Sequence, residues 1–300
     1  MQITDEQLSR WTSPASEHEE AKAERTERMI REAVNAHPVL KDLPIRVHAK
    51  GSVKNNTNVR LNSDVDVAVE YEGMIQLEYA NGGHFGMTGL TPYSGPYQNG
   101  QLYLYKAAVG AAMQEAFGPA SVDSSGNRVF RVRASDKSLA ADVAPCTTYW
   151  FYWPNSFHKG IELILDRSDG LRHFNYPDQH LTGGRDKNTR TGRRYKSVVR
   201  IIKNIEDQLV KAGKMQEVPS FLIECLVYNV PDSVFTAATP WRQMVVNTCS
   251  AIWAYTQSPE PTTGRWTEVN GIKWLFSPSQ RWTPAHAANL AAHVYGAVTT

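Results

Sequence analysis

Apolar and polar positions alternate in parts of the first half of the chain and follow a helical period in the second half. Residues 63–71 are predicted to form a strand, because valines recur at every second position. Short apolar runs at 45–49 and 138–144 predict two further strands, and turn residues at 123–127 and 166–170 indicate hairpins. These patterns predict a sheet in the first part of the chain.

Helical periodicity dominates elsewhere. Two helices are expected before about Asn35, with a break at 12–14 and Ser16 as the cap of the longer one. The other predicted helices lie near 98–117, 189–213, 219–230, 232–257 and 284–298. We therefore expect a mixed α/β fold, in which a sheet-containing lobe of residues 1–175 packs on a helical lobe of residues 176–300.

Asp64 and Asp66 alternate with the valines of residues 63–71 and carry the first candidate chemistry. Residues i and i+2 of a strand project from the same face, so the two carboxylates share a small volume. Burying them unpaired would cost on the order of several kcal/mol each, whereas a cation between them would offset their repulsion. An Asp-x-Asp sequence is also common on the polar face of an edge strand, and this ordinary interpretation stays open here.

Gly51 and Ser52 favour the metal interpretation. The strand predicted at 45–49 leads to Gly51, where the missing Cβ lets backbone N–H groups approach an anion, and Ser52 adds a hydroxyl donor. A phosphate-binding turn next to a carboxylate pair is typical of a nucleoside triphosphate site. Mg²⁺ is usually held by one or two carboxylates together with substrate phosphates, and Mn²⁺ has similar ligand preferences.

Asp142 is the candidate for a third carboxylate, since it stands alone in the apolar strand predicted at 138–144. An ordinary explanation is a carboxylate paired with a backbone N–H or with Arg131 or Arg133. Two-metal phosphoryl chemistry, however, requires a third acidic residue beside the pair. Asp136 competes for this role, but it lies in a polar connection, so we favour Asp142.

A strongly basic segment, residues 185–203, holds eight Lys or Arg and one Asp. Lys196, Arg200 and Lys203 fall at i, i+4 and i+7, which places them on one face of the predicted helix. Such a face is ordinarily solvated. Next to a metal site, it would also neutralise a bound triphosphate.

The next helix is predicted to start at Pro219 and Ser220. Free N–H groups at a helix start, together with the Ser220 hydroxyl, can meet an anion. Phe221 can present a ring on which a base stacks. The alternative is an ordinary capped core helix with Phe221 buried.

Composition adds a few limits. The 300 residues, 41% of them hydrophobic, suffice for a full core. Lys plus Arg number 32 and Asp plus Glu 30, and a formal charge of +2 offers no track for a long nucleic acid or an anionic membrane. The polar start lacks a signal segment and no apolar run reaches membrane-span length, so we expect a cytoplasmic protein. Cys146, Cys225 and Cys249 lack metal-site spacing, which predicts buried reduced thiols.

The segment 81–100 contains six glycines and follows the predicted metal-binding strand. Its length and composition are compatible with a mobile cover over the site. A surface insertion without function is an equally good interpretation, and both stay open.

These features in their order resemble the CD-NTases, cyclic-oligonucleotide synthases of bacteria that are related to cyclic GMP-AMP synthase and oligoadenylate synthase. The resemblance covers roughly residues 40–235. Its Gly-Ser and Asp-x-Asp signature is shared by the whole polymerase-beta-like superfamily, whereas the segments 174–205 and 218–231 are more specific.

The resemblance implies a polymerase-beta-like nucleotidyltransferase lobe with a mixed sheet, packed on a helical lobe like that of oligoadenylate synthase, with the active site in the cleft. It implies a Mg²⁺-dependent enzyme that joins nucleoside triphosphates into a cyclic di- or trinucleotide and releases pyrophosphate. In bacteria such products are second messengers of anti-phage CBASS signalling. The implied partners are the nucleotide substrates and a downstream effector activated by the cyclic product.

The resemblance also implies roles for individual residues in binding two metal ions. Asp64 and Asp66 are expected to bind the metal of the triphosphate, and Asp66 and Asp142 to share the catalytic metal. Ser52, next to Gly51, is expected to contact a phosphate.

The remaining implied roles concern the nucleotide itself. Lys203 and Ser220 are expected to hold the triphosphate tail, and Phe221 to stack on the base, where animal relatives carry Tyr. Animal DNA sensors also carry a His/Cys zinc insertion, but the corresponding region here has His173 and His180 and no cysteine. We therefore expect no structural zinc.

Two other functions remain open. A nucleotidyltransferase that modifies RNA or protein, of the tRNA-tailing or toxin type, would share the chemistry, but the near-neutral charge disfavours it. A catalytically inactive nucleotide sensor would not need all three carboxylates.

Overall fold

The computed structural model describes residues 3–59, 64–79, 99–153, 156–164, 173–257, 265–278 and 280–299. The chain divides into two compact units, each built from more than one segment. The sheet unit comprises Glu17–Val53 and Leu61–Pro177, and the helical unit comprises Met1–Ser16, Lys54–Arg60 and Asp178–Thr300. The division expected from the sequence at 175/176 is therefore incomplete, because two short segments of the first half belong to the helical unit.

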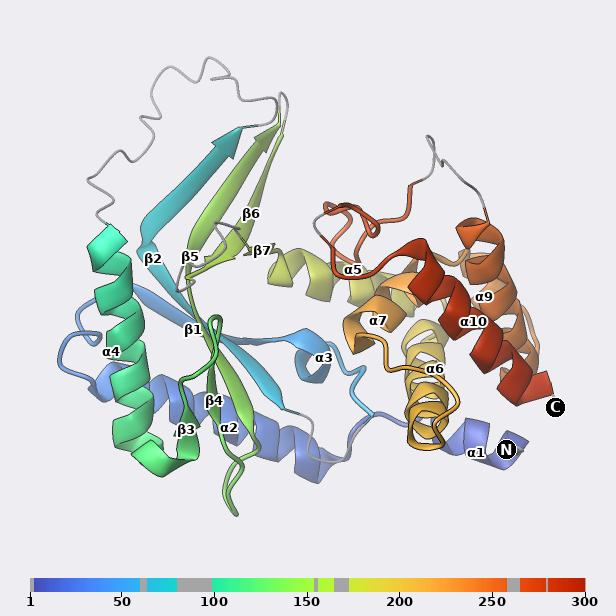
Figure 1. Cartoon of the computed structure of the whole chain (residues 1–300), viewed down its shortest axis with the longest axis horizontal. Helices are drawn as coiled ribbons and strands as arrows, with labels where there is room; N and C mark the ends of the chain where they lie inside the picture. The colour runs from blue at the N-terminus through green and yellow to red at the C-terminus, as the bar shows by residue number, and fades with distance from the viewer. Residues whose placement is uncertain are drawn as a thin grey trace. The chain divides into compact units, whose positions relative to one another are not determined.

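A mixed sheet forms the centre of the sheet unit (Figure 1). Its strands are β1 (Ile45–Lys50), β2 (Val65–Tyr79), β3 (Val122–Asp123), β4 (Phe130–Val132), β5 (Ala141–Trp153), β6 (Ser156–Leu163) and β7 (Phe174–Asn175). The main order is β1-β2-β5-β4-β3, with β6 and β7 continuing beside β5. Among the strands that the structure describes, β2 and β5 pair in parallel and the other pairs are antiparallel. The predicted mixed α/β class is confirmed.

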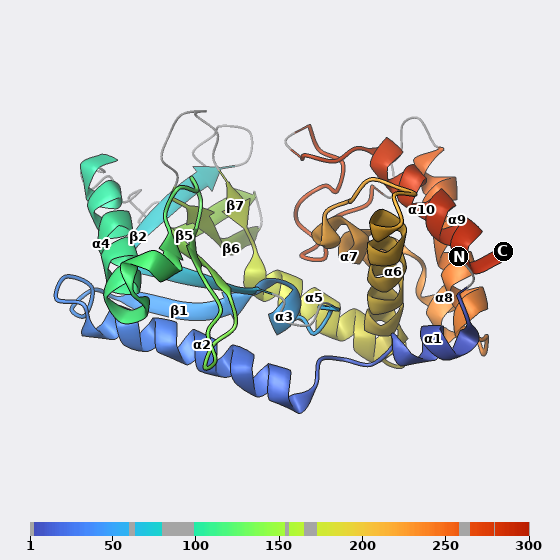
Figure 2. The same cartoon turned by 60° about the horizontal axis from the view of Figure 1, so that its bottom comes forward.

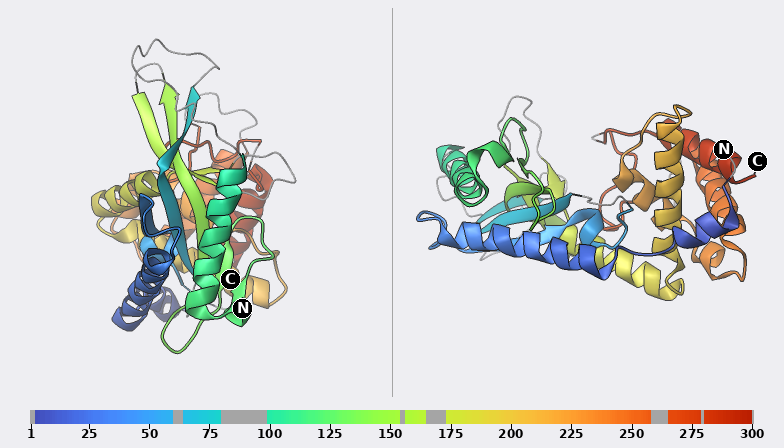
Figure 3. Two further views of the ribbon diagram at one scale, coloured as in Figure 1. Left: turned by 90° about the vertical axis from the view of Figure 1, so that its left-hand side faces the viewer. Right: turned by 90° about the horizontal axis from the view of Figure 1, so that it is seen from below.

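One face of this sheet is covered by helices of the same unit, α2 (Glu17–Ala36) and α4 (Asn99–Phe117) (Figures 2 and 3). The buried face carries Val65, Val67 and Val69, each at most 1% exposed, which pack into the core that the two helices share. Alternation in a strand then sends the intervening residues of β2 to the opposite face. Burial of the valines therefore directs the Asp66 carboxylate toward the face of the sheet opposite α2 and α4.

The helical unit is built around the amphipathic helix α6 (Arg194–Lys211), whose apolar residues are almost completely buried. The other helices are α1 (Asp5–Arg10), α5 (Pro177–Arg190), α7 (Ser220–Asn229), α8 (Asp232–Thr236), α9 (Trp241–Thr256) and α10 (Pro284–Thr299). Helices α9 and α10 lie side by side (Figure 1). Arg242 on α9 joins the two ends of the unit, since it donates hydrogen bonds to the carbonyls of Ile3 and Val298.

Two helix predictions were wrong. The single helix expected at 232–257 is interrupted, because Pro240 caps the start of α9 and cannot continue a preceding helix. Helix α5 was not predicted, since Gly183 and Gly184 weaken its helical pattern. Gly183 has a packing reason, because a Cβ there would lie 2.3 Å from the carbonyl oxygen of Val269.

Cys146, Cys225 and Cys249 are free and buried, as predicted. None of the helices in the described part of the chain is long and apolar enough to span a membrane. The proposed cover at 81–100, up to its final two residues, and the hairpin expected at 166–170 lie outside the described residues.

Candidate functional site

Two of the three candidate carboxylates are register partners on neighbouring parallel strands. Asp66 on β2 pairs with Asp142 on β5, so their side chains project side by side from the face opposite the buried valines. Asp64 is exposed and immediately precedes β2. The sheet therefore brings together residues that are far apart in the sequence.

Basic side chains from the strands on either side, β1 and β4, flank this pair. Lys50, at the end of β1, places its Nζ 3.4 Å from Oδ1 of Asp66. On the other side, Nε of Arg131 on β4 lies 3.7 Å from Oδ1 of Asp142. Arg131 was considered as a partner of Asp142 from the sequence alone, but its side chain is 67% exposed, so the pairing is a weak, solvent-screened contact.

Asp142 has a pKa raised above its usual value. The largest cause is its partial burial, followed by the negative charge of Asp66, while Arg131 partly offsets both effects. The neighbouring Arg131 and Lys50 therefore offset only part of the effects of burial and of Asp66 on this carboxyl group. A carboxylate pair in this condition is suited to bind a further cation.

Gly51 brings the backbone close to Asp66. It has φ +72° and opens the short helix α3 (Gly51–Lys54) directly after β1. A Cβ at this position would lie only 2.1 Å from Oδ2 of Asp66, so only glycine allows this approach. The sequence analysis predicted that Gly51 and Ser52 lie beside the aspartates. In the structure, Lys50, which directly precedes Gly51, is the register partner of Asp66.

The donor set fits a hard divalent cation such as Mg²⁺. Asp64, Asp66 and Asp142 would hold it through carboxylate oxygens, the ligand type that Mg²⁺ prefers. Among the described residues, no three His, Cys, Asp or Glu side chains form a complete metal-binding group by themselves.

Replacing the paired carboxylates should abolish turnover without unfolding the protein. We predict that Asp66→Asn and Asp142→Asn each reduce pyrophosphate release by at least about a hundredfold, because each removes a ligand of the proposed metal. The melting temperature without metal should hold or rise, since one of two repelling charges is lost. Substantial pyrophosphate release by either variant would contradict the metal assignment.

Gly51→Ala should inactivate the enzyme for a different reason, since its Cβ would displace Asp66. Gly118→Ala is a matched control, because Gly118 also has a positive φ, +85°, but nothing lies within 4 Å of its added Cβ. Both substitutions strain the backbone, by about 1–3 kcal/mol each. We expect both to lower the melting temperature and only Gly51→Ala to abolish pyrophosphate release.

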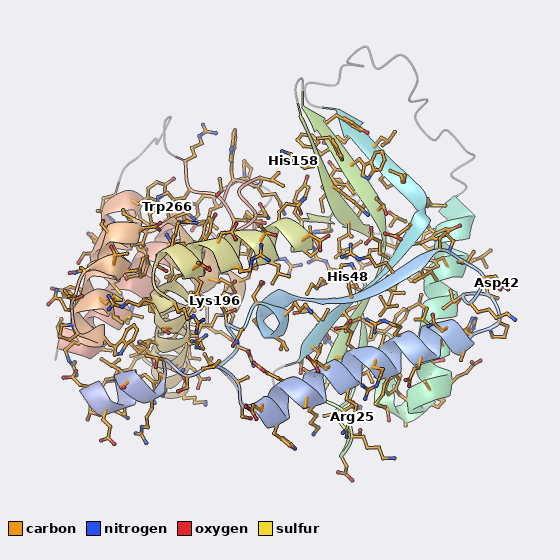
Figure 4. All side chains as sticks on the ribbon, turned by 180° about the vertical axis from the view of Figure 1, so that it is seen from behind. Arg25, Asp42, His48, His158, Lys196 and Trp266 are labelled. Atoms are coloured by element: carbon orange, nitrogen blue, oxygen red, sulfur yellow. The ribbon has the colours of Figure 1, made fainter. Side chains whose placement is uncertain are left out.

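Glu70 lies on the same face as Asp66, four residues further along β2, and is almost fully buried. It accepts a hydrogen bond of 2.7 Å from Thr148, and His48 on β1 lies 3.3 Å away (Figure 4). Burial alone would raise the pKa of Glu70, but the contacts with His48 and Thr148 lower it overall. Glu70 therefore has its own partners.

In the helical unit, two of the three predicted phosphate-binding cations are buried. Arg200, 6% exposed, donates hydrogen bonds to the backbone carbonyls of Thr12 and Asn56. Lys203, 3% exposed, donates to the carbonyl of Thr57 at 3.1 Å. Both side chains thus hold segments of the first half of the chain to α6.

Lys196, at the start of α6 (Figure 4), is half-buried. Desolvation lowers the pKa of Lys196 and of Lys203, and it lowers the pKa of Arg200 to about 10. The ordinary interpretation of this face as solvated does not hold for Arg200 and Lys203, which are buried. Their contact with a triphosphate remains a prediction.

Phe221 belongs to a cluster of three rings on the helical unit. Its ring centroid lies 5.3 Å from that of His180 on α5 and 5.9 Å from that of Trp282. Trp282 is anchored by a hydrogen bond from its indole N–H to the carbonyl of Leu275. Phe221 is 36% exposed, which contradicts a fully buried core ring, and the neighbouring Ser220 at the start of α7 is also exposed.

Glu224 lies one helical turn after Ser220 and is fully enclosed. Its Oε1 contacts Nε2 of His180 at 2.9 Å, and its Oε2 accepts a hydrogen bond of 2.7 Å from the Thr57 hydroxyl. Lys203 places its Nζ 3.9 Å from the same Oε2. Burial alone would raise the pKa of Glu224, but His180, Lys203 and Thr57 together lower it to about 2.

The low pKa of Glu224 predicts that the free energy of unfolding falls at acidic pH. Because the folded-state pKa of about 2 lies below the ordinary 4.5, Glu224 stabilises the fold above about pH 4.5 and loses this contribution as the pH falls toward 2. The contribution is on the order of 3 kcal/mol. Glu224→Gln should therefore be less stable than the wild type at pH 7, with a smaller further loss at pH 3.5. Urea unfolding at both pH values measures this.

Glu115→Gln is the control for that comparison, because Glu115 is exposed on α4. It should follow the wild type at both pH values. A wild-type loss between pH 7 and pH 3.5 that Glu224→Gln reproduces in full would contradict the role of Glu224 in acid stability.

Several residues of these clusters were not identified from the sequence: Lys50, Thr57, His180 as a ring partner, Glu224 and Trp282. Thr57 and Glu224 had the only local signal, since Thr57 follows the Gly-Ser motif and Glu224 is a lone acid in an apolar helix. The partners of these residues are up to 167 positions away, so the pairing itself has no local signature.

The chain is similar to known proteins over nearly its whole length. Residues 182–298 match the family model described as the cGAS/DncV-like nucleotidyltransferase C-terminal helical domain. A cyclic dipyrimidine nucleotide synthase, CdnE, of Legionella pneumophila is 35% identical over 290 residues, 94% of each chain.

Two solved structures share the architecture. The CdnE cyclic dinucleotide synthase of Elizabethkingia meningoseptica, solved with GTP and Apcpp, has a TM-score of 0.80 at 28% identity and covers 99% of this chain and 100% of its own. The CdnE c-UMP-AMP synthase of Rhodothermus marinus, solved with Apcpp and Upnpp, has a TM-score of 0.79 at 26% identity, with 97% and 95% covered.

Proposed function

We propose, from the premise that the chain belongs to the CD-NTase family of nucleotidyltransferases, that it joins two or three nucleoside triphosphates into a cyclic oligonucleotide. The observation that carries the proposal is the pair Asp66 and Asp142, side by side on parallel strands next to the Gly51 turn. The relatives supply the product class, since their names describe cyclic dinucleotide synthases.

The reaction is an in-line displacement at the α-phosphate. A ribose hydroxyl of one nucleotide forms a bond to the α-phosphorus of another, the bond to the bridging oxygen breaks, and pyrophosphate leaves with that electron pair. The hydroxyl proton passes to solvent or to a nearby carboxylate. A second displacement within the linear intermediate closes the ring.

The sheet unit provides groups for the phosphates. Asp64, Asp66 and Asp142 would hold two Mg²⁺ ions, or Mn²⁺ in their place, and bound ions would neutralise the leaving pyrophosphate and lower the pKa of the attacking hydroxyl. Gly51 and Ser52 open α3, where a backbone N–H and a hydroxyl can donate to a phosphate oxygen.

The helical unit provides groups for the nucleotide. Ser220 opens α7, which has no side-chain cap at its start, and the N–H groups of a helix start favour an anion. Phe221 exposes about a third of its surface beside two further rings, so a base can stack on it. Lys196, Arg200 and Lys203 are the candidates for the triphosphate tail.

We further propose that the cyclic product is a second messenger of CBASS anti-phage signalling in the cytoplasm, where it activates a separate effector. The near-neutral net charge supports small substrates over RNA. Transfer to RNA or protein, and nucleotide sensing without catalysis, are the alternatives that the following experiment addresses.

The product should be a closed ring. We expect purified protein with Mg²⁺ and labelled ATP, GTP, CTP and UTP, supplied singly and in pairs, to yield a product that resists phosphatase. A linear product keeps a terminal phosphate and loses it to phosphatase, whereas a ring has only internal phosphodiesters. Chromatography after phosphatase treatment, followed by a linkage-specific nuclease, identifies the bases and linkages.

Asp66→Asn is the control and should give no product. Label that appears only in phosphatase-sensitive linear chains would contradict cyclisation. Label that passes only to added tRNA or protein would favour a macromolecule-modifying enzyme. Nucleotide binding without any pyrophosphate release would favour the inactive sensor.

A further inference from the structure

Residues 54–59, which we call the linker, lie along the chain between the Gly51–Ser52 turn and Asp64. The linker belongs to the helical unit, although the segments before and after it belong to the sheet unit. Three side chains of the helical unit hold it. Arg200 binds its backbone at Asn56, Lys203 binds its backbone at Thr57, and Glu224 accepts the Thr57 hydroxyl.

Glu224 uses its two carboxylate oxygens for two different neighbours. Oε2 accepts the 2.7 Å bond from Thr57, and Lys203 reinforces this side from 3.9 Å. Oε1 accepts from Nε2 of His180 at 2.9 Å, since an ionised carboxylate can only accept. The His180 ring in turn packs against the Phe221 ring, with 5.3 Å between centroids and 30° between planes.

All members of this network except Phe221 are buried. Thr57 is 0% exposed, Glu224 2%, Lys203 3% and His180 7%. A hydrogen bond to an ionised group in such surroundings is strong, and leaving one partner unpaired is costly. Glu224 therefore contacts both the linker and the His180 ring, and it holds the linker together with Arg200 and Lys203.

We propose that Glu224 is a shared positioning residue, whose Oε2 fixes the linker that leads to the catalytic Asp64, and whose Oε1 fixes the His180–Phe221 rings on which the base stacks. This proposal rests on the proposed function. It predicts that the two halves of the network act on different parameters, the linker half on turnover and the ring half on nucleotide affinity. A purely structural network would lower stability without this division.

Thr57→Val and His180→Phe test the two halves separately. Thr57→Val removes the hydroxyl at nearly constant volume, and we expect kcat for pyrophosphate release to fall about tenfold or more, with KM within about twofold. His180→Phe keeps a ring but removes the donor. We expect it to weaken binding of a non-hydrolysable triphosphate by about fivefold or more in calorimetry, with a smaller change in kcat.

Glu224→Ala should change both parameters, and Thr57→Ser, which keeps the hydroxyl, should restore kcat. The matched control is Thr148→Val, since Thr148 donates an equally short bond of 2.7 Å to another buried carboxylate, Glu70, in the sheet unit. It should lower the melting temperature as Thr57→Val does and leave kcat and KM unchanged. If Glu224→Ala does not fold, Thr57→Val and His180→Phe still test the two halves of the network, since both variants retain the Glu224 carboxylate.

Hydrogen exchange supplies a readout that does not depend on turnover. Backbone amides of the linker should exchange faster in Thr57→Val than in the wild type or in Thr148→Val. Unchanged exchange in the linker, or equal effects of Thr57→Val and His180→Phe on KM and kcat, would overturn the proposal. Absence of pyrophosphate release from the wild type would refute the proposed function instead, while exchange in the linker would still show whether the Thr57 contact holds it.

Discussion

Repulsion between Asp66 and Asp142 is the constraint on which the rest of the site depends. The valines of β2 are buried beneath α2 and α4, so the sheet has no freedom to turn its aspartates away from each other. Partial burial raises the pKa of Asp142 most, the negative charge of Asp66 raises it further, and the flanking Arg131 and Lys50 offset only part of these two effects. Burial of the valines on one face of the sheet thus places Asp66 and Asp142 together on the opposite face, where the two carboxylates attract cations.

The buried cations of α6, Arg200 and Lys203, are stabilised by hydrogen bonds to the backbone. Arg200 and Lys203 are taken out of water, which is unfavourable unless their N–H groups find acceptors. Backbone carbonyls of Thr12, Asn56 and Thr57 are those acceptors. The same basic residues that suggest phosphate binding in the sequence therefore also determine which segments of the first half of the chain join the helical unit.

The sequence predicted elements whose signal is local and missed contacts whose partners are remote. Alternation along β2 was sufficient to place Asp66 on the face opposite the buried valines, because a strand has a strict period of two, whereas Asp64 lies just before the strand. The amphipathic pattern of α6 predicted a helix and placed Lys196, Arg200 and Lys203 together, but it could not show that Arg200 meets Thr12, which is 188 residues away. A charged side chain on a helix has no local feature that separates a solvated face from one covered by a distant segment.

The two units meet a common requirement by different means, since each must hold ionised groups in a defined position while burying an apolar core. In the sheet unit the backbone does this, because strand register fixes Asp66 beside Asp142. In the helical unit side chains do it, because Glu224 is fixed by its bonds to Thr57 and His180. Register resists change as long as the core is intact, whereas a hydrogen-bonded carboxylate loses one of its partners when a single hydroxyl is removed. We therefore expect substitutions around Glu224 to change the positions of its neighbours more readily than substitutions along the sheet change the pair of Asp66 and Asp142.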